Sequence, residues 1–228
     1  MGIYRQGEGN RGSLKWIQIL ISRQPEILNL KIRQSFRIPR SIEIKWVSPL
    51  KEKGYAEYRD EAFLEVLGIA TQKVKLSDFW PKGGPQWDAL GKLSDGSPLL
   101  IEAKAHISEV LSDIRASNPN SVKLIEESLK RTKRDLGVKT KNPWTGPFYQ
   151  YANRIAHLHF LNNLNGIKSF LVFVNFVGDE GMGGPKSEPE WLGVNNLIQS
   201  YLGIGKINLK PFMADICIDV AELSLKIF

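Results

Sequence analysis

Two carboxylates and an ammonium stand close together in one stretch of the chain, residues 86–105, which reads QWDALGKLSDGSPLLIEAKA. Asp88 lies near its start, and Glu102 and Lys104 lie near its end. Two carboxylates, helped by a backbone carbonyl, suit Mg²⁺, which polarises a phosphoryl oxygen and lowers the pKa of a bound water. A nearby lysine can orient that water or stabilise the charge of the transition state. These residue types therefore indicate metal-assisted chemistry on a phosphate ester.

A β-hairpin would bring the three side chains together. The Asp-Gly pair at residues 95–96 is a turn signal between two arms. A two-residue loop would place Asp88 opposite Ala103, with Glu102 on the other face of the sheet. A three-residue loop with a left-handed glycine would place Asp88 opposite Glu102, and Lys104 would share their face. The sequence permits both loops, and only the second makes a compact site.

Asp88 followed by Glu102-Ala103-Lys104 resembles the signature of the PD-(D/E)XK phosphodiesterase superfamily, the fold of many restriction endonucleases, in a bacterial branch. The resemblance implies that Asp88 and Glu102 bind Mg²⁺ or Mn²⁺ together with the Ala103 carbonyl. It also implies that Lys104 positions or activates the attacking water. The proline of the superfamily name is absent, since Pro85 stands three residues before Asp88.

A second Glu-x-Lys string occurs at residues 43–45, with Glu26 upstream. Glu26 follows Pro25 at a predicted helix start, and no hairpin joins it to that string. We interpret SIEIKWV, residues 41–47, as an alternating strand with its charges in solvent. A solvated strand face is also the alternative for the hairpin residues, and the turn context favours the site there.

The resemblance further implies an acid from the first core helix. The segment AEYRDEAFLEVLG predicts an amphipathic helix over about residues 57–67. Glu61, in the pattern Glu-x-x-Leu, is the candidate for this auxiliary catalytic acid, with Glu57, Asp60 and Glu65 as rivals. The position of Glu61 opposite the apolar stripe argues equally for exposure to solvent.

The densest basic stretch falls on a predicted helix over about residues 121–136. Four of its cations are candidates for contacts with a nucleic-acid backbone: Lys130, Arg131, Lys133 and Arg134. The alternative is a solvated helix face balanced by nearby acids. A helix from Phe148 onward should pack on the sheet, and it offers Gln150 and Arg154 as further contacts. Arg154 suits a bidentate phosphate contact.

The order of predicted elements is helix, strand, hairpin, helix and strand. The first core strand is expected over residues 73–80, and the last is the apolar run SFLVFVNFV. The resemblance implies an α/β fold: a mixed central β-sheet flanked by helices, the restriction endonuclease-like αβββαβ core. Residues 1–50 are expected as an N-terminal arm and helical appendage. Residues 51–228 are expected as the nuclease-like domain with a C-terminal αβ addition, all in one compact unit.

Composition sets limits on the class of protein. The chain has 228 residues, enough for a sizeable core, and a net charge of +7 that favours a polyanionic partner. Its one cysteine, Cys217, excludes an intramolecular disulfide framework. No apolar stretch approaches the ~20 residues of a membrane span, and the N-terminus lacks an apolar signal segment. We therefore expect a cytoplasmic protein without a membrane partner.

Together these features predict a Mg²⁺- or Mn²⁺-dependent nuclease that acts on DNA with a water nucleophile. The alternative is a nucleic-acid-binding protein with a non-catalytic nuclease-like fold. A third interpretation is a partner protein that dimerises through the N-terminal helices. Because one such site cuts one strand, cleavage of a duplex would suggest a homodimer.

Overall fold

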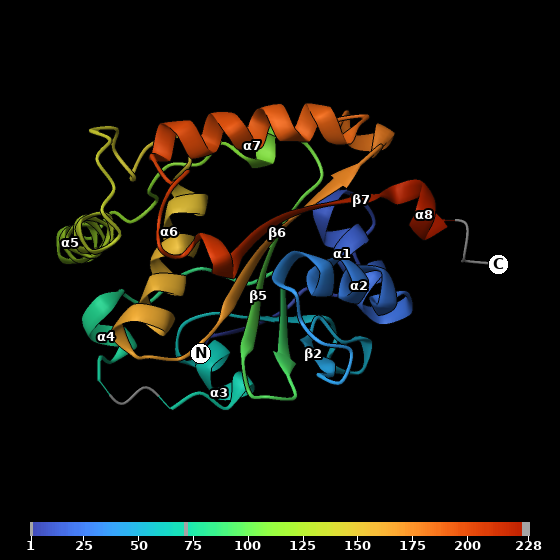
Figure 1. The fold of residues 1–228 in the computed structure, drawn as a ribbon, viewed down its shortest axis with the longest axis horizontal. Helices are drawn as coiled ribbons and strands as arrows, with labels where there is room; N and C mark the ends of the chain where they lie inside the picture. The colour runs from blue at the N-terminus through green and yellow to red at the C-terminus, as the bar shows by residue number, and fades with distance from the viewer. Residues whose placement is uncertain (1, 71–72, 225–228) are drawn as a thin grey trace.

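The computed structural model describes residues 2–70 and 73–224, and a five-stranded sheet forms its centre (Figure 1). The strands are, in order across the sheet, β2 (Ile44–Ser48), β4 (Ala89–Leu93), β5 (Pro98–Lys104), β6 (Phe170–Val177) and β7 (Met213–Asp219). The first three strands pair antiparallel, whereas β5, β6 and β7 run parallel. The α/β fold with a mixed central sheet flanked by helices is therefore confirmed.

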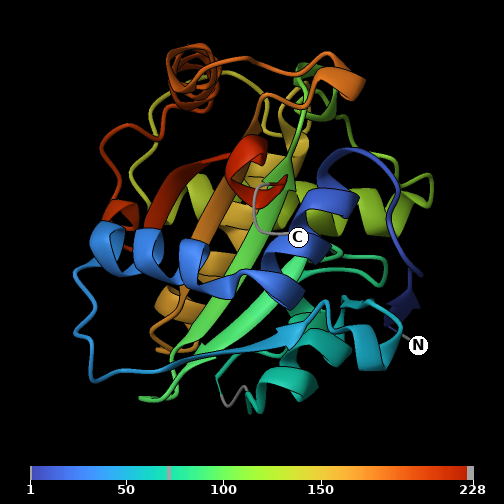
Figure 2. The same cartoon turned by 90° about the vertical axis from the view of Figure 1, so that its right-hand side faces the viewer.

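Helices cover both faces of this sheet (Figure 2). One face packs against α1 (Gly12–Arg23), α2 (Pro25–Phe36) and α8 (Val220–Ser224). The other face packs against α3 (Glu61–Leu67), α4 (Leu76–Phe79), α5 (Pro119–Asp135), α6 (Tyr149–His159) and α7 (Glu188–Leu202). We call these the α1 face and the α6 face. Within the described ranges, no helix is both long and apolar enough to cross a membrane.

Side chains alternate between the two faces along each central strand. On β5, Leu100 lies in the core of the α6 face, and its neighbour Leu99 lies in the core of the α1 face. On β6, Phe173 faces α6 and Val172 faces α1. Both faces of these strands are buried, as the near-continuous apolar run SFLVFVNFV predicts. Glu102 and Lys104 therefore share the α6 face with Leu100.

The first core strand is not where the sequence predicted it. Residues 73–80 contain the short helix α4 at Leu76–Phe79 and no strand, because Ser77 and Asp78 favour turns over strands. The strand on the other side of β4 from β5 is β2, which overlaps the alternating segment SIEIKWV. Trp46 in β2 is buried and Lys45 is exposed, as alternation requires. The N-terminal helices, predicted as an appendage, cover the α1 face of the same sheet.

The segment between β2 and β4 leaves the central sheet. It carries β3 (Ala56–Tyr58), which pairs antiparallel with β1 (Ile3–Arg5) in a separate two-stranded sheet. The helix predicted over residues 57–67 therefore begins only at α3, and its first residues belong to β3. Asp60, with a positive φ of 51°, ends the extended backbone between them. Its carboxylate accepts hydrogen bonds from two backbone N–H groups of the loop at residues 81–85.

Candidate active site at the end of the central hairpin

The register of the β4–β5 hairpin decides whether the predicted residues meet. Ala89 pairs with Ile101, so the same register places Asp88 opposite Glu102. Leu93, the last residue before the turn, donates its N–H to the carbonyl of Ser97 at 2.9 Å. The loop between them therefore has three residues. Gly96 in that loop has a φ of 91°, which favours glycine. The structure thus has the compact register of the two that the sequence permitted.

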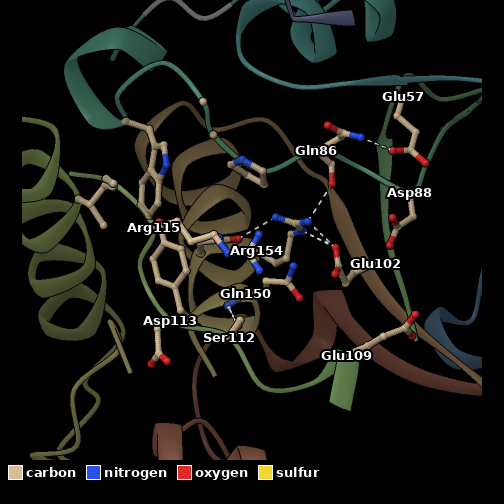
Figure 3. Close-up of a pocket in the computed structure, with 18 of the residues that line it drawn as sticks. Glu57, Gln86, Asp88, Glu102, Glu109, Ser112, Asp113, Arg115, Gln150 and Arg154 are labelled. Carbon is tan, nitrogen blue, oxygen red and sulfur yellow. Dashed lines mark hydrogen bonds and ion pairs between the residues drawn. The ribbon is translucent and has the colours of Figure 1, made fainter. Parts of the chain in front are cut away.

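Asp88, Glu102, Ala103 and Lys104 lie together on the wall of a pocket of about 820 Å³ (Figure 3). Asp88 Oδ2 accepts a hydrogen bond of 2.7 Å from the Ala103 N–H. The N–H and C=O of one strand residue point to the same side, so the Ala103 carbonyl also faces the side of Asp88. Lys104 Nζ contacts Glu102 Oε1, and both side chains are buried. The predicted signature is therefore assembled in space.

Arg154 from α6 completes the surroundings of Glu102. Its Nε and its terminal nitrogen contact Glu102 Oε2 at 2.6 and 2.5 Å. The remaining donors reach the Gln86 carbonyl and the Asn153 side chain, each at 2.8 Å, and the guanidinium lies 4.9 Å from the Trp87 ring centre. Arg154, predicted to contact a phosphate, thus lines the pocket and is ion-paired with Glu102.

Gln150, one turn earlier on α6, also lines the pocket. Its backbone N–H donates to the Ser112 hydroxyl at 2.9 Å, and its side-chain Oε1 is buried without a hydrogen-bond partner. The structure therefore brings Gln150 to the site, with an acceptor atom that the described residues leave unused.

Glu61, the predicted auxiliary acid, does not reach the site. It is exposed in the first turn of α3 and does not line the pocket, because that turn presents it to solvent. Its rival Glu57 does line the pocket, from β3, and is buried. Glu57 Oε2 accepts hydrogen bonds from Gln86 at 2.5 Å and from Gln6 at 2.8 Å. Figure 3 shows Glu57, Asp88 and Glu102 on one side of the pocket.

The acids of this group differ in their protonation. Burial raises the pKa of Asp88 well above its ordinary value, and repulsion from Glu102 adds to the rise. Burial also raises the pKa of Glu57. Burial acts in the same direction on Glu102, but Arg154 and Lys104 outweigh it and lower the pKa of that carboxyl. Glu102 therefore holds its negative charge, whereas Asp88 and Glu57 gain protons more readily.

The donor atoms fit a hard divalent cation in one arrangement. Among the described residues, no group of three or more His, Cys, Asp and Glu side chains could hold a metal ion. Mg²⁺ needs fewer protein ligands, because it keeps several waters. Asp88, Glu102 and the Ala103 carbonyl form such a smaller set, and a cation there would relieve the repulsion between the two acids. A carboxylate oxygen that accepts one hydrogen bond keeps a further lone pair for a cation.

The predicted basic cluster lies outside this pocket. Lys130, Arg131, Lys133 and Arg134 occupy the C-terminal half of α5, and the pocket meets only the first turns of that helix. Arg131 and Arg134 pair with Asp135 at 3.6 and 3.0 Å. Lys133 donates to the Asn142 carbonyl at 3.0 Å. The structure thus gives Arg131, Lys133 and Arg134 local partners, and it does not bring the four cations to the acids.

Sequence reasoning missed the wall that faces the acid group. Residues 108–118, between β5 and α5, contribute Asp113 and Arg115 to that wall, and they contribute Glu109 to the side of the acids (Figure 3). Glu109 accepts the Ala105 N–H at 2.6 Å and the Ser13 hydroxyl at 3.0 Å, so it joins the end of β5 to the start of α1. The polar segment carries no motif, and its composition indicates only a loop.

No family model, curated protein or solved structure matches this chain. What the site can do follows from its chemistry alone. A buried ammonium beside two carboxylates and the Ala103 carbonyl, on the wall of a pocket, suits a hydrolysis in which negative charge develops.

Proposed function

We propose that this protein is a metal-dependent nuclease that hydrolyses phosphodiester bonds of DNA. The observation that carries the proposal is the convergence of Asp88, Glu102, Ala103 and Lys104 on one pocket wall. The same set resembles the PD-(D/E)XK signature, and we include that superfamily in the proposal. The net charge of +7 supports a polyanionic substrate.

Each residue has a distinct task in this reaction. Bound Mg²⁺ or Mn²⁺ would supply a Lewis acid for a phosphoryl oxygen and a water of lowered pKa. Asp88, Glu102 and the Ala103 carbonyl would hold the cation. Lys104, fixed beside Glu102, orients the attacking water and stabilises the charge that develops on the phosphoryl group. Arg154 keeps Glu102 ionised and in place.

The proposal includes a cytoplasmic location. It also includes a homodimer if both strands of a duplex are cut, because one site of this kind cuts one strand. Glu57 replaces Glu61 as the proposed auxiliary acid, because it lines the pocket and interacts electrostatically with Glu102.

A second candidate is a nucleic-acid-binding protein whose nuclease-like site does not act. The observation in its favour is that both oxygens of Glu102 are already ion-paired, one with Lys104 and the other with Arg154. Glu102 would have to weaken its ion pair with Lys104 or Arg154 before one of its oxygens could ligate a cation.

Calorimetric titration of Mg²⁺ and Mn²⁺, with cleavage assays on plasmid, linear duplex and single-stranded DNA, tests the proposal. We expect the wild type to bind metal and to cleave. Asp88→Ala should lose both, and Lys104→Ala should lose about 100-fold in rate or more while it still binds metal. Asp113→Ala, an exposed acid of the facing wall, is the matched control and should retain cleavage within about threefold.

The outcomes separate the two candidates. Cleavage that survives Asp88→Ala would reject this site as the catalytic centre. Salt-sensitive DNA binding without metal binding or cleavage would support the non-catalytic candidate. Binding of neither metal nor DNA would reject both.

A further inference from the structure

Asn175, next to the candidate site, is a buried polar residue whose side chain lacks a partner. It lies on β6 and is completely buried, and neither its amide oxygen nor its amide nitrogen has a hydrogen-bond partner. Buried polar side chains are nearly always hydrogen-bonded, because an unpaired group costs free energy. An amide kept in this state beside a candidate site points to a task in that site.

The strand register places Asn175 beside Lys104. The two residues are partners in the parallel β5–β6 pair, two residues along the strands from the pair of Glu102 and Phe173. They also lie on the same face of the sheet. Lys104 is four residues after Leu100 on β5 and Asn175 is two residues after Phe173 on β6, and residues an even number apart on a strand share a face. Leu100 and Phe173 both pack in the core of the α6 face. Partners in neighbouring strands hold their Cβ atoms about 5 Å apart, within reach of a lysine side chain.

Lys104 has donors to spare. An ammonium carries three N–H donors and accepts nothing. Within residues 2–70 and 73–224, Glu102 is the one acceptor that Lys104 Nζ contacts. A buried ammonium with unused donors and a buried amide oxygen with no donor therefore stand in neighbouring positions.

We propose that Asn175 is a positioning residue for Lys104. One water accepts a hydrogen bond from the Lys104 ammonium and donates one to Asn175 Oδ1. The contact matters most when a cation occupies the site, because the cation competes with Lys104 for the charge of Glu102. A neutral amide oxygen then holds the ammonium in place without attracting the cation away. The role in hydrolysis rests on the proposed function, whereas the contact itself does not.

The variant Asn175→Leu separates this role from a structural one. Leucine has a similar size and no polar atom, so it removes the unpaired amide from the core. We expect the melting temperature to rise by about 2–4 °C and the rate of cleavage to fall about tenfold or more. A side chain needed only for packing or for a hidden structural hydrogen bond would instead lose stability on this change. Asn175→Ser, which keeps a neutral acceptor oxygen, should recover part of the rate.

Asn195→Leu is the matched control. Asn195 lies on α7, is also buried, and its Oδ1 also lacks a partner. It lines a small cavity with Tyr151 and Asp215, away from the larger pocket. We expect this variant to cleave at the wild-type rate within about twofold.

A readout without substrate or metal tests the contact directly. In protein labelled with ¹³C-lysine, the Hε–Cε signal of Lys104 is assigned by its loss in Lys104→Arg. We expect Asn175→Leu to shift this signal in the metal-free protein and to shift it further when Mg²⁺ is added, and Asn195→Leu to leave it unchanged.

The two measurements distinguish the failure of each idea. An unchanged Lys104 signal in Asn175→Leu, with and without Mg²⁺, would overturn the contact. A shifted signal with an unchanged cleavage rate would overturn the positioning role. A shifted signal in a protein that cleaves none of the substrates would keep the contact and reject the proposed function.

Discussion

The protonation of Asp88 is the property of a single residue that most affects the site. Its pKa lies well above the ordinary value, because the carboxyl is buried and Glu102 repels its charge. Folding therefore favours the protonated form, and stability falls as the pH rises from the unfolded pKa of about 3.9 towards the raised folded pKa. Above the folded pKa the side chain is ionised in both states, and the loss of stability of the metal-free protein is complete.

We expect Asp88→Asn to stabilise the metal-free protein at pH 8 and to do so less at pH 5. The amide removes the buried charge and keeps an oxygen for the Ala103 N–H. Each kcal/mol gained should raise the melting temperature by about 2–4 °C in a chain of this size. Thermal unfolding at the two pH values measures the difference, and equal shifts at both would show that the charge of Asp88 is not the cause.

Mg²⁺ should act in the opposite sense on the same residue. A cation that binds only the folded state stabilises it by about 2.7 kcal/mol at 100 times its dissociation constant. We expect Mg²⁺ to raise the melting temperature of the wild type and to leave that of Asp88→Asn unchanged. The rise should also vanish when the pH falls below the raised pKa of Asp88, because a protonated carboxyl is a poor ligand. Removal of the metal with a chelator should restore the metal-free curve.

The hairpin turn is the element that sets the register of the site. Gly96 has a φ of 91°, and a Cβ added there would meet nothing within 4 Å. Gly96→Ala should therefore cost only the backbone strain, about 1–2 kcal/mol. Urea unfolding measures the cost. Gly193→Ala is the control, because Gly193 lies inside α7 with similar space around it, and alanine should stabilise that helix by about 0.5–1 kcal/mol.

An ion pair between Arg154 and Glu102 joins α6 to β5. Arg154→Met would leave Glu102 buried with Lys104 as its single cationic partner. We expect a loss of about 3 kcal/mol, since the removal of one member of a buried pair leaves charge uncompensated. The free energies of unfolding of Arg154→Met, Glu102→Gln and the double variant, measured with denaturant, form a double-mutant cycle. Additive losses in the double variant would contradict a direct coupling.

Site residues positioned by local sequence signals could be predicted, whereas those positioned by long-range contacts could not. Asp88, Glu102 and Lys104 could be placed because one turn joins their strands, so a short-range pattern sets their geometry. Glu57 could be named only as a rival, since its position depends on the pairing of β3 with β1, about fifty residues earlier in the chain. The strand predicted at residues 73–80 failed because composition favours a turn there, and β2 took its place in the sheet.

For the whole molecule, the question is which cations a long substrate would meet. Arg115 lines the pocket and is exposed, whereas Lys130 lies on the far half of α5. We expect Arg115→Gln to weaken the binding of a short oligonucleotide and to reduce its salt slope by about one. Lys130→Gln, the matched control, should leave both unchanged. Fluorescence anisotropy at several salt concentrations measures both, and the reverse ranking would move the substrate path to α5.

The overall arrangement was more predictable than its details. Apolar runs with turn signals between them indicate a mixed α/β sheet, because strands covered on both faces must be apolar throughout. The wall formed by residues 108–118 was not foreseen, because an irregular polar segment carries no periodicity from which its position follows.

The first residues of the chain lie against the same pocket. Gln6 bonds Glu57, Ser13 lines the pocket, and the residues between them are mostly exposed, among them Arg11. This segment is thus a natural target for trypsin, and a molecule lodged in the pocket should slow its digestion. Limited proteolysis would then report occupancy for any compound, so that candidate ligands can be screened before the reaction is known.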